Sequence, residues 1–261
     1  RIEVVIPPRE PHYVGDGFRV HNFIPSAYRL DMKRMDPFIM LDYNSKYYFP
    51  PTDKPRGVGV HPHRGFETVT IAYKGKVAHH DSGGGGGVIA EGDVQWMTAA
   101  GGILHEEFHS PGFTRTGGPF RMIQLWVNLP AKDKMSAPGY QSIVNADIPS
   151  VELPDGAGRA RVIAGDFRGH KGPARTFTPI NVWDMRLNRD ASVTLDLPEG
   201  HTTMLVVLSG RVVINGQQDA QEAEMVMLDR QGASVTIDAR SDAVILVLTG
   251  EPIDEPVVGH G

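Results

Sequence analysis

The stretch that decides the fold covers residues 61–77 and reads HPHRGFETVTIAYKGKV. It combines a pair of histidines, a β-branched segment over 68–73 and a glycine turn at Gly75 that leads into a returning segment. β-Branched and apolar segments bounded by glycine or proline are typical of strands joined as hairpins. This stretch therefore predicts two antiparallel strands, with potential metal ligands where the first one begins.

The remainder of the chain repeats the same kind of short segment. Its 30 glycines and 20 prolines punctuate runs rich in valine, isoleucine, threonine and phenylalanine, and helical patterns are sparse. This spacing of strands and turn residues is typical of an all-β sandwich or barrel protein. Residues 203–208 and 243–248 are almost continuously apolar, so we expect both faces of these two strands to be buried.

One phrase recurs in the two halves of the chain. Residues 70–77 and residues 206–213 each consist of a β-branched strand, a glycine turn and a returning strand. Between 131 and 150 the composition shifts to lysine, aspartate, serine, proline and glycine, which indicates a connection between domains. The sequence therefore predicts two tandem β-barrels, an N-terminal domain over residues 1–140 and a C-terminal domain over residues 141–261.

Two short pairs of potential metal ligands lie in the N-terminal half. His61 and His63 bracket a proline, which favours extended structure, and His105 and Glu107 form a second pair 44 positions later. A strand directs residues i and i+2 to the same face. Two neighbouring strands would therefore present three imidazoles and one carboxylate to one ion.

The second copy of the barrel lacks these ligands. Aligning the two copies places His201 on Phe66 and Thr236 on His105. We therefore expect the metal site in the N-terminal barrel and a C-terminal barrel without metal ligands.

The absence of cysteine restricts the chemistry of the site. The chain contains no cysteine, so it has no disulfide, no thiolate zinc site and no cysteine nucleophile. Three neutral imidazoles and one carboxylate suit Fe(II), Mn, Ni, Cu or Zn, and an octahedral ion with four protein ligands keeps two open positions. A structural zinc site would ordinarily be closed and tetrahedral.

The alternation of side chains along these two strands predicts which other residues face the barrel interior. If the phase persists through the Arg64–Gly65 bend, the interior residues include Glu67, Val69, Ile71 and Tyr73, while Thr68, Thr70 and Ala72 point outward. On the second segment, Ile103, His105, Glu107 and His109 share one face. We expect His109 at the rim, and His79 and His80 at the surface or behind the ligands. Candidate cavity walls are Phe66, Trp96, Met97, Met122, Gln124 and Trp126.

Charge and composition exclude several classes of function. The net charge is -5, and lysine and arginine are scattered, so nucleic-acid binding and attachment to an anionic membrane have no electrostatic support. No apolar run approaches the length that spans a bilayer, and the first residues lack a signal sequence, which predicts a cytoplasmic protein. The glycine run 83–87 has no Walker-type continuation, so we expect a flexible hairpin loop.

Several motifs together resemble the signature of the pirin family of bicupins. They are HPHRGFETV at 61–69, DSG at 81–83, GDVQWMTA at 92–99, GILH at 102–105, QLWVNL at 124–129 and GEPIDEPV at 250–257. These motifs extend across almost the whole chain, which makes the resemblance far more specific than a lone His-x-His pair.

The resemblance implies two cupin barrels, with iron in the N-terminal one held by residues that match His61, His63, His105 and Glu107. A general cupin pattern would instead make Glu67 the carboxylate ligand, because it follows His63 by four positions. The pirin pattern uses the residue two beyond the last histidine. We therefore prefer Glu107 and keep Glu67 as the alternative.

The resemblance also implies an activity. A pirin-like protein would be an Fe2+-dependent dioxygenase that converts quercetin-like flavonols and O2 to a depside and carbon monoxide. Glu107 would hold the metal and act as the catalytic base that takes the phenolic proton. The alternative is a non-catalytic, metal-dependent protein-interaction module whose protein partner the sequence does not identify. A third reading is a structural metal in an inactive cupin.

Overall fold

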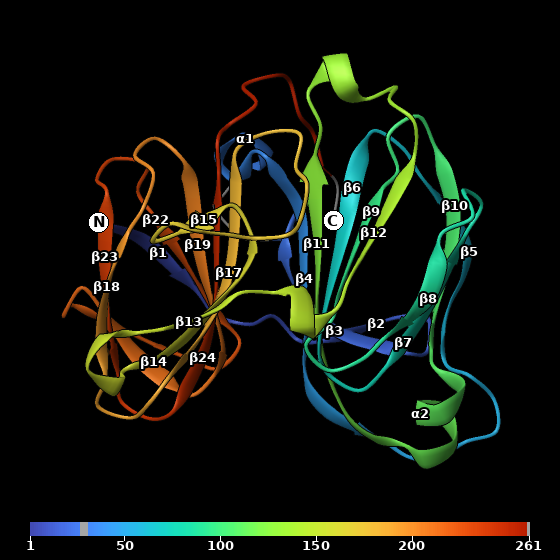
Figure 1. Ribbon diagram of the computed structural model, residues 1–261, viewed down its shortest axis with the longest axis horizontal. Helices are drawn as coiled ribbons and strands as arrows, with labels where there is room; N and C mark the ends of the chain where they lie inside the picture. Colours follow the sequence, from blue (N-terminus) through green and yellow to red (C-terminus); the bar gives the residue numbers. More distant parts are fainter. Residues whose placement is uncertain (27–30, 260–261) are drawn as a thin grey trace.

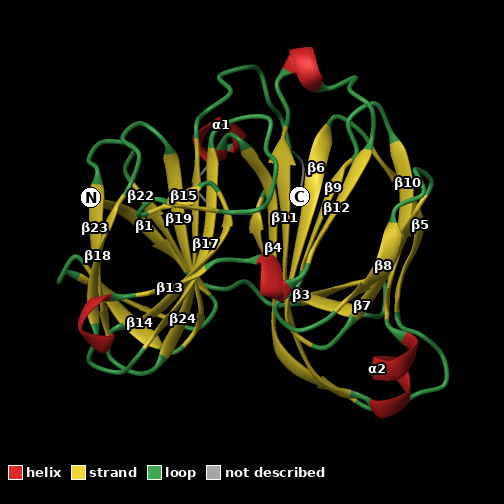
Figure 2. Ribbon diagram, in the orientation of Figure 1, coloured by secondary structure: helices red, strands yellow, loops and turns green. Residues whose placement is uncertain are grey.

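A computed structural model describes residues 1–26 and 31–259 of the chain. It is built almost entirely of antiparallel strands, which form two barrels side by side (Figure 1). Helical segments occupy only short connections (Figure 2). The predicted all-β fold with two barrels is therefore confirmed.

The N-terminal barrel closes around the predicted ligand pairs. Its strands are β2 His12–Val14, β3 Phe18–Ile24, β4 Phe38–Phe49, β5 Gly57–His63, β6 Phe66–Lys74, β7 Val77–Asp81, β8 Gly86–Ile89, β9 Val94–Thr98, β10 Ile103–His109, β11 Gly118–Asn128 and β12 Gly139–Ile143. Its larger sheet has the order β12-β9-β6-β11-β4-β3-β2, and its smaller sheet has the order β5-β10-β7-β8. The two ligand pairs thus lie on neighbouring strands of the smaller sheet.

The C-terminal barrel has the same two-sheet construction. Its strands are β1 Ile2–Ile6, β13 Ser150–Glu152, β14 Gly158–Ala164, β17 Ile180–Leu187, β18 Ser192–Asp196, β19 Thr202–Ser209, β20 Arg211–Ile214, β21 Gln218–Gln221, β22 Glu224–Leu228, β23 Ser234–Ala239 and β24 Ala243–Gly250. The larger sheet has the order β1-β22-β19-β24-β17-β14-β13 and the smaller sheet β18-β23-β20-β21, while β15 Asp166–Phe167 and β16 His170–Lys171 form a separate hairpin. The apolar strands β19 and β24 are buried along almost their whole length, as predicted.

The helices of the described residues are short connections. They are α1 Met32–Met35, α2 Pro111–Thr116, and the 3-10 turns η1 Ala131–Asp133, η2 Asn145–Asp147 and η3 Pro154–Gly156. Asp31 caps α1 by accepting from Arg34 N, and Ser110 caps α2 by accepting from Phe113 N.

Strand exchange connects the two barrels. β1, at the start of the chain, pairs with β22 of the C-terminal barrel, with Ile6 opposite Met225. β12 lies inside the segment 131–150, which we expected to be a connection, yet it pairs with β9 of the N-terminal barrel and crosses residue 140. Local composition does not report which sheet an edge strand joins. The division into 1–140 and 141–261 remains a prediction, with residues 2–6 paired to the sheet of the other barrel.

The central core lies between the two larger sheets. Strand β6 directs Val69, Ile71 and Tyr73 into this core, where they join Met204, Val206 and Leu208 of β19. The expectation that β6 turns these residues toward the interior of its own barrel is therefore wrong. The chain turns at Gly65 with φ 84° and enters a different sheet, so the phase of β5 does not continue into β6.

Candidate metal centre

The two predicted ligand pairs meet on the inner face of the smaller sheet. β5 and β10 run antiparallel, with His105 opposite His61 and Ile103 opposite His63. Nε2 of His105 lies 2.8 Å from Nε2 of His61 and 2.9 Å from Nε2 of His63. His63 and His105 are buried and His61 is partly buried, and all three ring nitrogens converge on one point.

Hydrogen bonds at Nδ1 of His61 and His105 favour the tautomer that has its lone pair on the converging Nε2 atom. Nδ1 of His61 donates to the Gly59 carbonyl at 2.7 Å, so its Nε2 carries a lone pair. Burial and neighbouring imidazoles lower the pKa of His63 to about 4 and the pKa of His105 to about 2, so both rings are neutral at physiological pH. Lone pairs that face each other at this distance repel, and a cation bound between them relieves that repulsion. The three nitrogens therefore fit a divalent metal ion.

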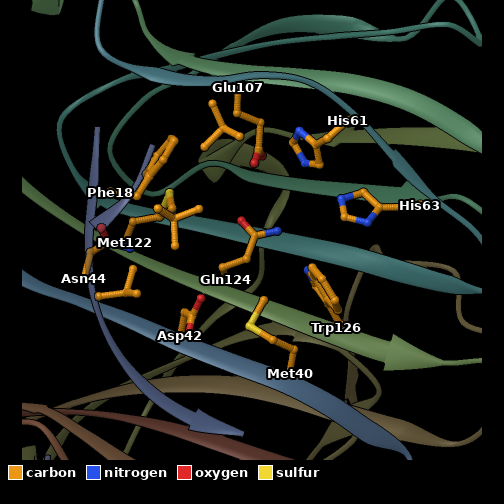
Figure 3. Close-up of a pocket in the computed structure, with 13 residues that line it drawn as sticks. Phe18, Met40, Asp42, Asn44, His61, His63, Glu107, Met122, Gln124 and Trp126 are labelled. Atoms are coloured by element: carbon orange, nitrogen blue, oxygen red, sulfur yellow. The ribbon is translucent and has the colours of Figure 1, made fainter. Parts of the chain in front are cut away.

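Glu107 lies beside the three imidazoles on the same face of β10. It lines a cavity together with His61 and His63, and the view in Figure 3 shows its carboxylate directed toward that space. Its carboxylate oxygen lies within 4.8 Å of ring nitrogens of His105 and His79, which form a second candidate group. Burial raises the pKa of Glu107 to about 7 in the metal-free chain. The structure thus brings His61, His63 and His105 together and places Glu107 next to His105, but it does not bring Glu107 within the same distance of all three imidazoles.

Two polar side chains hold one oxygen of Glu107. Gln95 Nε2 donates to Oε1 at 3.2 Å, and the Thr70 hydroxyl lies 3.3 Å from the same atom. The Thr70 hydroxyl is also 2.9 Å from Oε1 of Gln124, and its single proton serves one of these oxygens at a time. Oε2 of Glu107 accepts no hydrogen bond from the described residues, so it is free to bind a metal or a proton.

The orientation of His105 depends on His79, which lies behind the ligands, one of the two positions expected for it. His79 is buried on β7, and its Nε2 donates to Asp81 Oδ2 at 2.8 Å. Its Nδ1 is therefore an acceptor, and it receives the Gln95 amide at 3.0 Å and Nδ1–H of His105 at 3.3 Å. These bonds favour the tautomer of His105 that has its lone pair on Nε2, toward the other two imidazoles.

The glycine run 83–87 supports the same network. It forms the turn between β7 and β8, where the backbone N–H groups of Gly83 and Gly85 donate to Asp81 Oδ1 at 2.8 and 2.9 Å. A Cβ atom at Gly85 would clash with the Asp81 carboxylate and approach Tyr140. The hairpin predicted for this run is present, and its glycines allow the backbone to close around Asp81.

Replacing His79 with leucine is expected to weaken metal binding by roughly 10- to 100-fold, because His105 loses the acceptor that sets its tautomer. Competition with a chromophoric chelator for Ni(II) or Zn(II) at neutral pH measures the dissociation constant. His80→Leu is the matched control, since His80 is the next residue on β7 and is exposed. Equal dissociation constants for the two variants would contradict this assignment.

Glu67, the alternative carboxylate, does not face the three imidazoles. It is 1% exposed, and its Oε2 accepts from the Thr98 hydroxyl at 2.6 Å. It lines a separate pocket between the barrels with Tyr140 and Arg175. Glu67 belongs to neither group of candidate metal ligands found among the described residues. Glu67 is therefore not a candidate ligand in this structure. It lies on β6, which belongs to a different sheet from β5, so its side chain does not share the face of His61 and His63.

The buried carboxyl of Glu67 should make the stability of the folded chain depend on pH. Burial raises its pKa to about 7 from an ordinary value of 4.5. The folded chain therefore binds this proton more tightly than the unfolded chain, so this contribution to stability is lost as pH rises from 4.5 through 7. Glu67→Gln keeps an acceptor for Thr98. The free energy of unfolding of this variant, relative to that of the parent, is expected to rise by about 2–3 kcal/mol from pH 4.5 to pH 8. Urea unfolding at both pH values measures this change, and a pH-independent difference would argue against it.

A cavity with about 470 Å³ of empty space, partly open to solvent, lies beside the ligands. Apolar side chains make most of its wall and a few polar groups interrupt it (Figure 3). The residues that line it are Val14, Phe18, Val20, Met40, Asp42, Asn44, Val58, His61, His63, Glu107, Met122, Gln124 and Trp126. An apolar pocket with a few convergent polar groups suits a small organic ligand.

The structure confirms only part of the expected cavity wall. Met122, Gln124 and Trp126 line the cavity as expected. Trp96 faces the central core between the barrels, Met97 packs with Ala99 and Ile103, and Phe66 stacks on Trp126 with ring centroids 4.6 Å apart.

His109 is also placed differently from the rim position that we expected. It is 1% exposed, and its Nε2 donates to the Gly17 carbonyl at 2.7 Å. Aromatic rings surround it, namely those of Phe18, Phe49, Phe113 and Phe120. The end of β10 is covered by α2 and the β11 side of the barrel, so this histidine belongs to the core.

Comparison with known proteins gives the family. Residues 17–127 match the model of the Pirin family, and residues 182–261 match the model of the Pirin C-terminal cupin domain. A Pseudomonas aeruginosa protein named "Putative quercetin 2,3-dioxygenase PA2418" is 53% identical over 250 residues, which cover 96% of this chain and 86% of the relative. The chain belongs to the pirin family. The resemblance and the two cupin barrels inferred from the motifs are thus confirmed.

Other pirins match over nearly the full length. Pirin-1 of Arabidopsis thaliana is 36% identical over 252 residues, covering 95% of this chain and 82% of the relative. A crystal structure of quercetin 2,3-dioxygenase from Acinetobacter baumannii has a TM-score of 0.95 and 50% identity, covering 100% of this chain and 90% of that one. The bacterial pirin YhhW from Escherichia coli, solved in complex with nickel(II), has a TM-score of 0.72 and 20% identity, covering 95% and 99%, and shows the shared fold.

None of the helices in the described part of this pirin is long and apolar enough to cross a lipid bilayer. The cytoplasmic location expected from the sequence remains a prediction.

Proposed function

We propose that this pirin is a metal-dependent dioxygenase that acts on flavonols of the quercetin type, with Fe2+ as its metal. The observation that carries the proposal is the convergence of the ring nitrogens of His61, His63 and His105, with Glu107 next to His105, at the end of a mainly apolar cavity. The naming of similar proteins as quercetin 2,3-dioxygenases supports this class of reaction.

The donor set determines which ions fit. His61, His63, His105 and Glu107 would hold the ion, and nitrogen and oxygen donors without thiolate suit Fe2+ and, as alternatives, Mn, Ni, Cu and Zn. When bound, iron would supply a Lewis acid for the substrate oxygens and a route for electrons between substrate and dioxygen.

The chain itself would contribute a base and a dry environment. Oε2 of Glu107 accepts no hydrogen bond from the described residues, and the side chain lines the cavity, so this carboxylate is placed to accept a proton from a bound substrate. We assign Glu107 the role of taking the proton from the flavonol 3-hydroxyl. The apolar side chains of Phe18, Met40 and Met122 would exclude water from the reacting atoms.

The proposed net reaction is balanced without a reductant. Both atoms of one O2 enter the flavonol, two carbon–carbon bonds break, and one carbon leaves as carbon monoxide while the remainder forms a depside ester. The expected partners are therefore a small aromatic substrate and O2.

The test is turnover by protein loaded anaerobically with Fe2+. With quercetin as substrate, the loaded protein should consume O2 and release carbon monoxide in equal amounts. Parallel loading with Mn, Ni, Cu and Zn ranks the metals by the turnover that each supports. Metal-loaded protein that consumes no O2 with a panel of flavonols, but retains one stable protein partner in pull-downs, would favour the metal-dependent interaction module instead.

A further inference from the structure

A row of polar side chains crosses the larger sheet of the N-terminal barrel beneath the cavity. Thr70 on β6 lies opposite Gln124 on β11, which lies opposite Asp42 on β4, and Asp42 in turn lies opposite Asn22 on β3. Neighbouring strands are about 4.8 Å apart, so Asp42 is roughly 10 Å across the sheet from Thr70. Because Thr70 contacts Glu107, the row leads from the metal end of the cavity to a second polar group. Figure 3 shows Gln124 and Asp42 of this row together with Glu107.

Asn44 stands beside this second polar group. It follows Asp42 by two positions on β4, lines the cavity and is 1% exposed. Neither its amide nitrogen nor its amide oxygen has a hydrogen-bond partner among the described residues. Buried amides are nearly always paired in folded proteins, because an unpaired one loses its hydration without compensation. An unpaired amide in a cavity wall is therefore a group available to a ligand.

Asp42 complements this amide. Its Oδ1 accepts from Asn22 Nδ2 at 2.6 Å, and its Oδ2 receives no hydrogen bond from the described residues. The two side chains together offer an N–H donor and two oxygen acceptors. A hydroxyl group matches this set, because it accepts from Nδ2 of Asn44 while it donates to an oxygen of Asn44 or Asp42.

We propose that Asn44 and Asp42 bind a hydroxyl group on the end of the substrate farthest from the metal. They would thereby select flavonols that carry a hydroxyl group on the 2-phenyl ring. This inference rests on the proposed function, because it assumes that the cavity holds a flavonol. The apolar residues of the cavity wall, including Met40 and Trp126, suit a planar aromatic body. The separation of the ends suits a substrate of more than one ring.

The test compares two probes that differ by one hydroxyl group, 3-hydroxyflavone and 3,4′-dihydroxyflavone. Binding to the Zn2+-loaded protein, which avoids turnover, is followed by quenching of tryptophan fluorescence. The parent protein is expected to bind the dihydroxylated probe roughly tenfold more tightly. Asn44→Leu is expected to abolish this preference while it retains binding of 3-hydroxyflavone.

Two further variants keep the test decisive. Lys46→Leu makes the same kind of substitution at an exposed residue two positions further along β4, which does not line the cavity, and it is expected to preserve the preference. Asn44→Val removes both the N–H donor and the oxygen acceptor with a smaller side chain than leucine, so it should weaken only the dihydroxylated probe. It decides the question if Asn44→Leu does not fold.

The outcomes separate the inference from the proposed function. Equal affinities for both probes in the parent, or a preference retained in both Asn44 variants, would overturn the role of Asn44 and leave the dioxygenase proposal standing. If neither probe binds the metal-loaded parent, the flavonol substrate itself is wrong and the inference falls with it. Asn44→Leu should also raise the thermal midpoint of the free protein, because it removes an unpaired buried amide. A lowered midpoint in a folded variant would show that the amide has a structural partner.

Discussion

His105→Ala is expected to lower metal affinity by at least about 100-fold. His105 is the central member of the proposed ligand set, since its Nε2 lies within 2.9 Å of the corresponding atoms of both other imidazoles. The alanine variant keeps only two of the three nitrogen donors, those of His61 and His63. Elemental analysis after dialysis, together with chelator competition, measures the loss.

The matched control for this variant is Glu67→Gln, which changes a buried carboxyl that points away from the imidazoles. Its metal content should equal that of the parent. Retained metal in the His105 variant, or loss of metal in the Glu67 variant, would show that the carboxylate or the strand has been assigned wrongly.

Glu107→Gln is expected to reduce flavonol turnover by roughly 100- to 10,000-fold at saturating metal, the range typical of a lost general base. Glutamine can still accept at Oε1 from Gln95 and Thr70, so the local structure should persist. It carries no negative charge and takes no proton from a phenol. Turnover should fall by more than added metal can restore.

Glu106→Gln is the control, because Glu106 is the preceding residue on β10 and lies on its opposite face. This variant should keep the parent turnover. If Glu107→Gln recovers full turnover when excess metal is added, then Glu107 is a metal ligand only and the base lies elsewhere.

The alternation of a strand made much of the metal centre predictable. The pattern of residues 103–109 was expected to turn every second side chain inward, and the structure buries Ile103, His105, Glu107 and His109 in that register. The pair His61 and His63 follows the same rule on β5. A site composed of two such strands needs only their pairing, which the antiparallel register supplies.

The same rule failed where the chain changes sheets. Glu67 lies four residues beyond His63, but the turn at Gly65 separates two strands of different sheets. Periodicity within one strand carries no information across such a turn. The choice of Glu107 over Glu67 therefore came from the resemblance to pirins, and the positions of the two side chains agree with it.

Other features depend on pairings between distant segments, which leave no local pattern. His79 reaches His105 because β7 pairs with β10, and its role follows from Asp81 and the glycine turn behind it. β1 joins the C-terminal sheet although it lies at the other end of the chain. The unpaired amide of Asn44 becomes visible only when its neighbours in space are known.

We propose that one metal ion binds between His61, His63 and His105 beside Glu107. The most direct measurement is an anomalous difference map from crystals of protein purified without exposure to affinity nickel, collected on both sides of the iron edge. The expected result is a single peak about 2.0–2.3 Å from the three Nε2 atoms, with a signal that changes across that edge. A peak at Glu67 or in the C-terminal barrel, or no peak in metal-replete protein, would contradict the account.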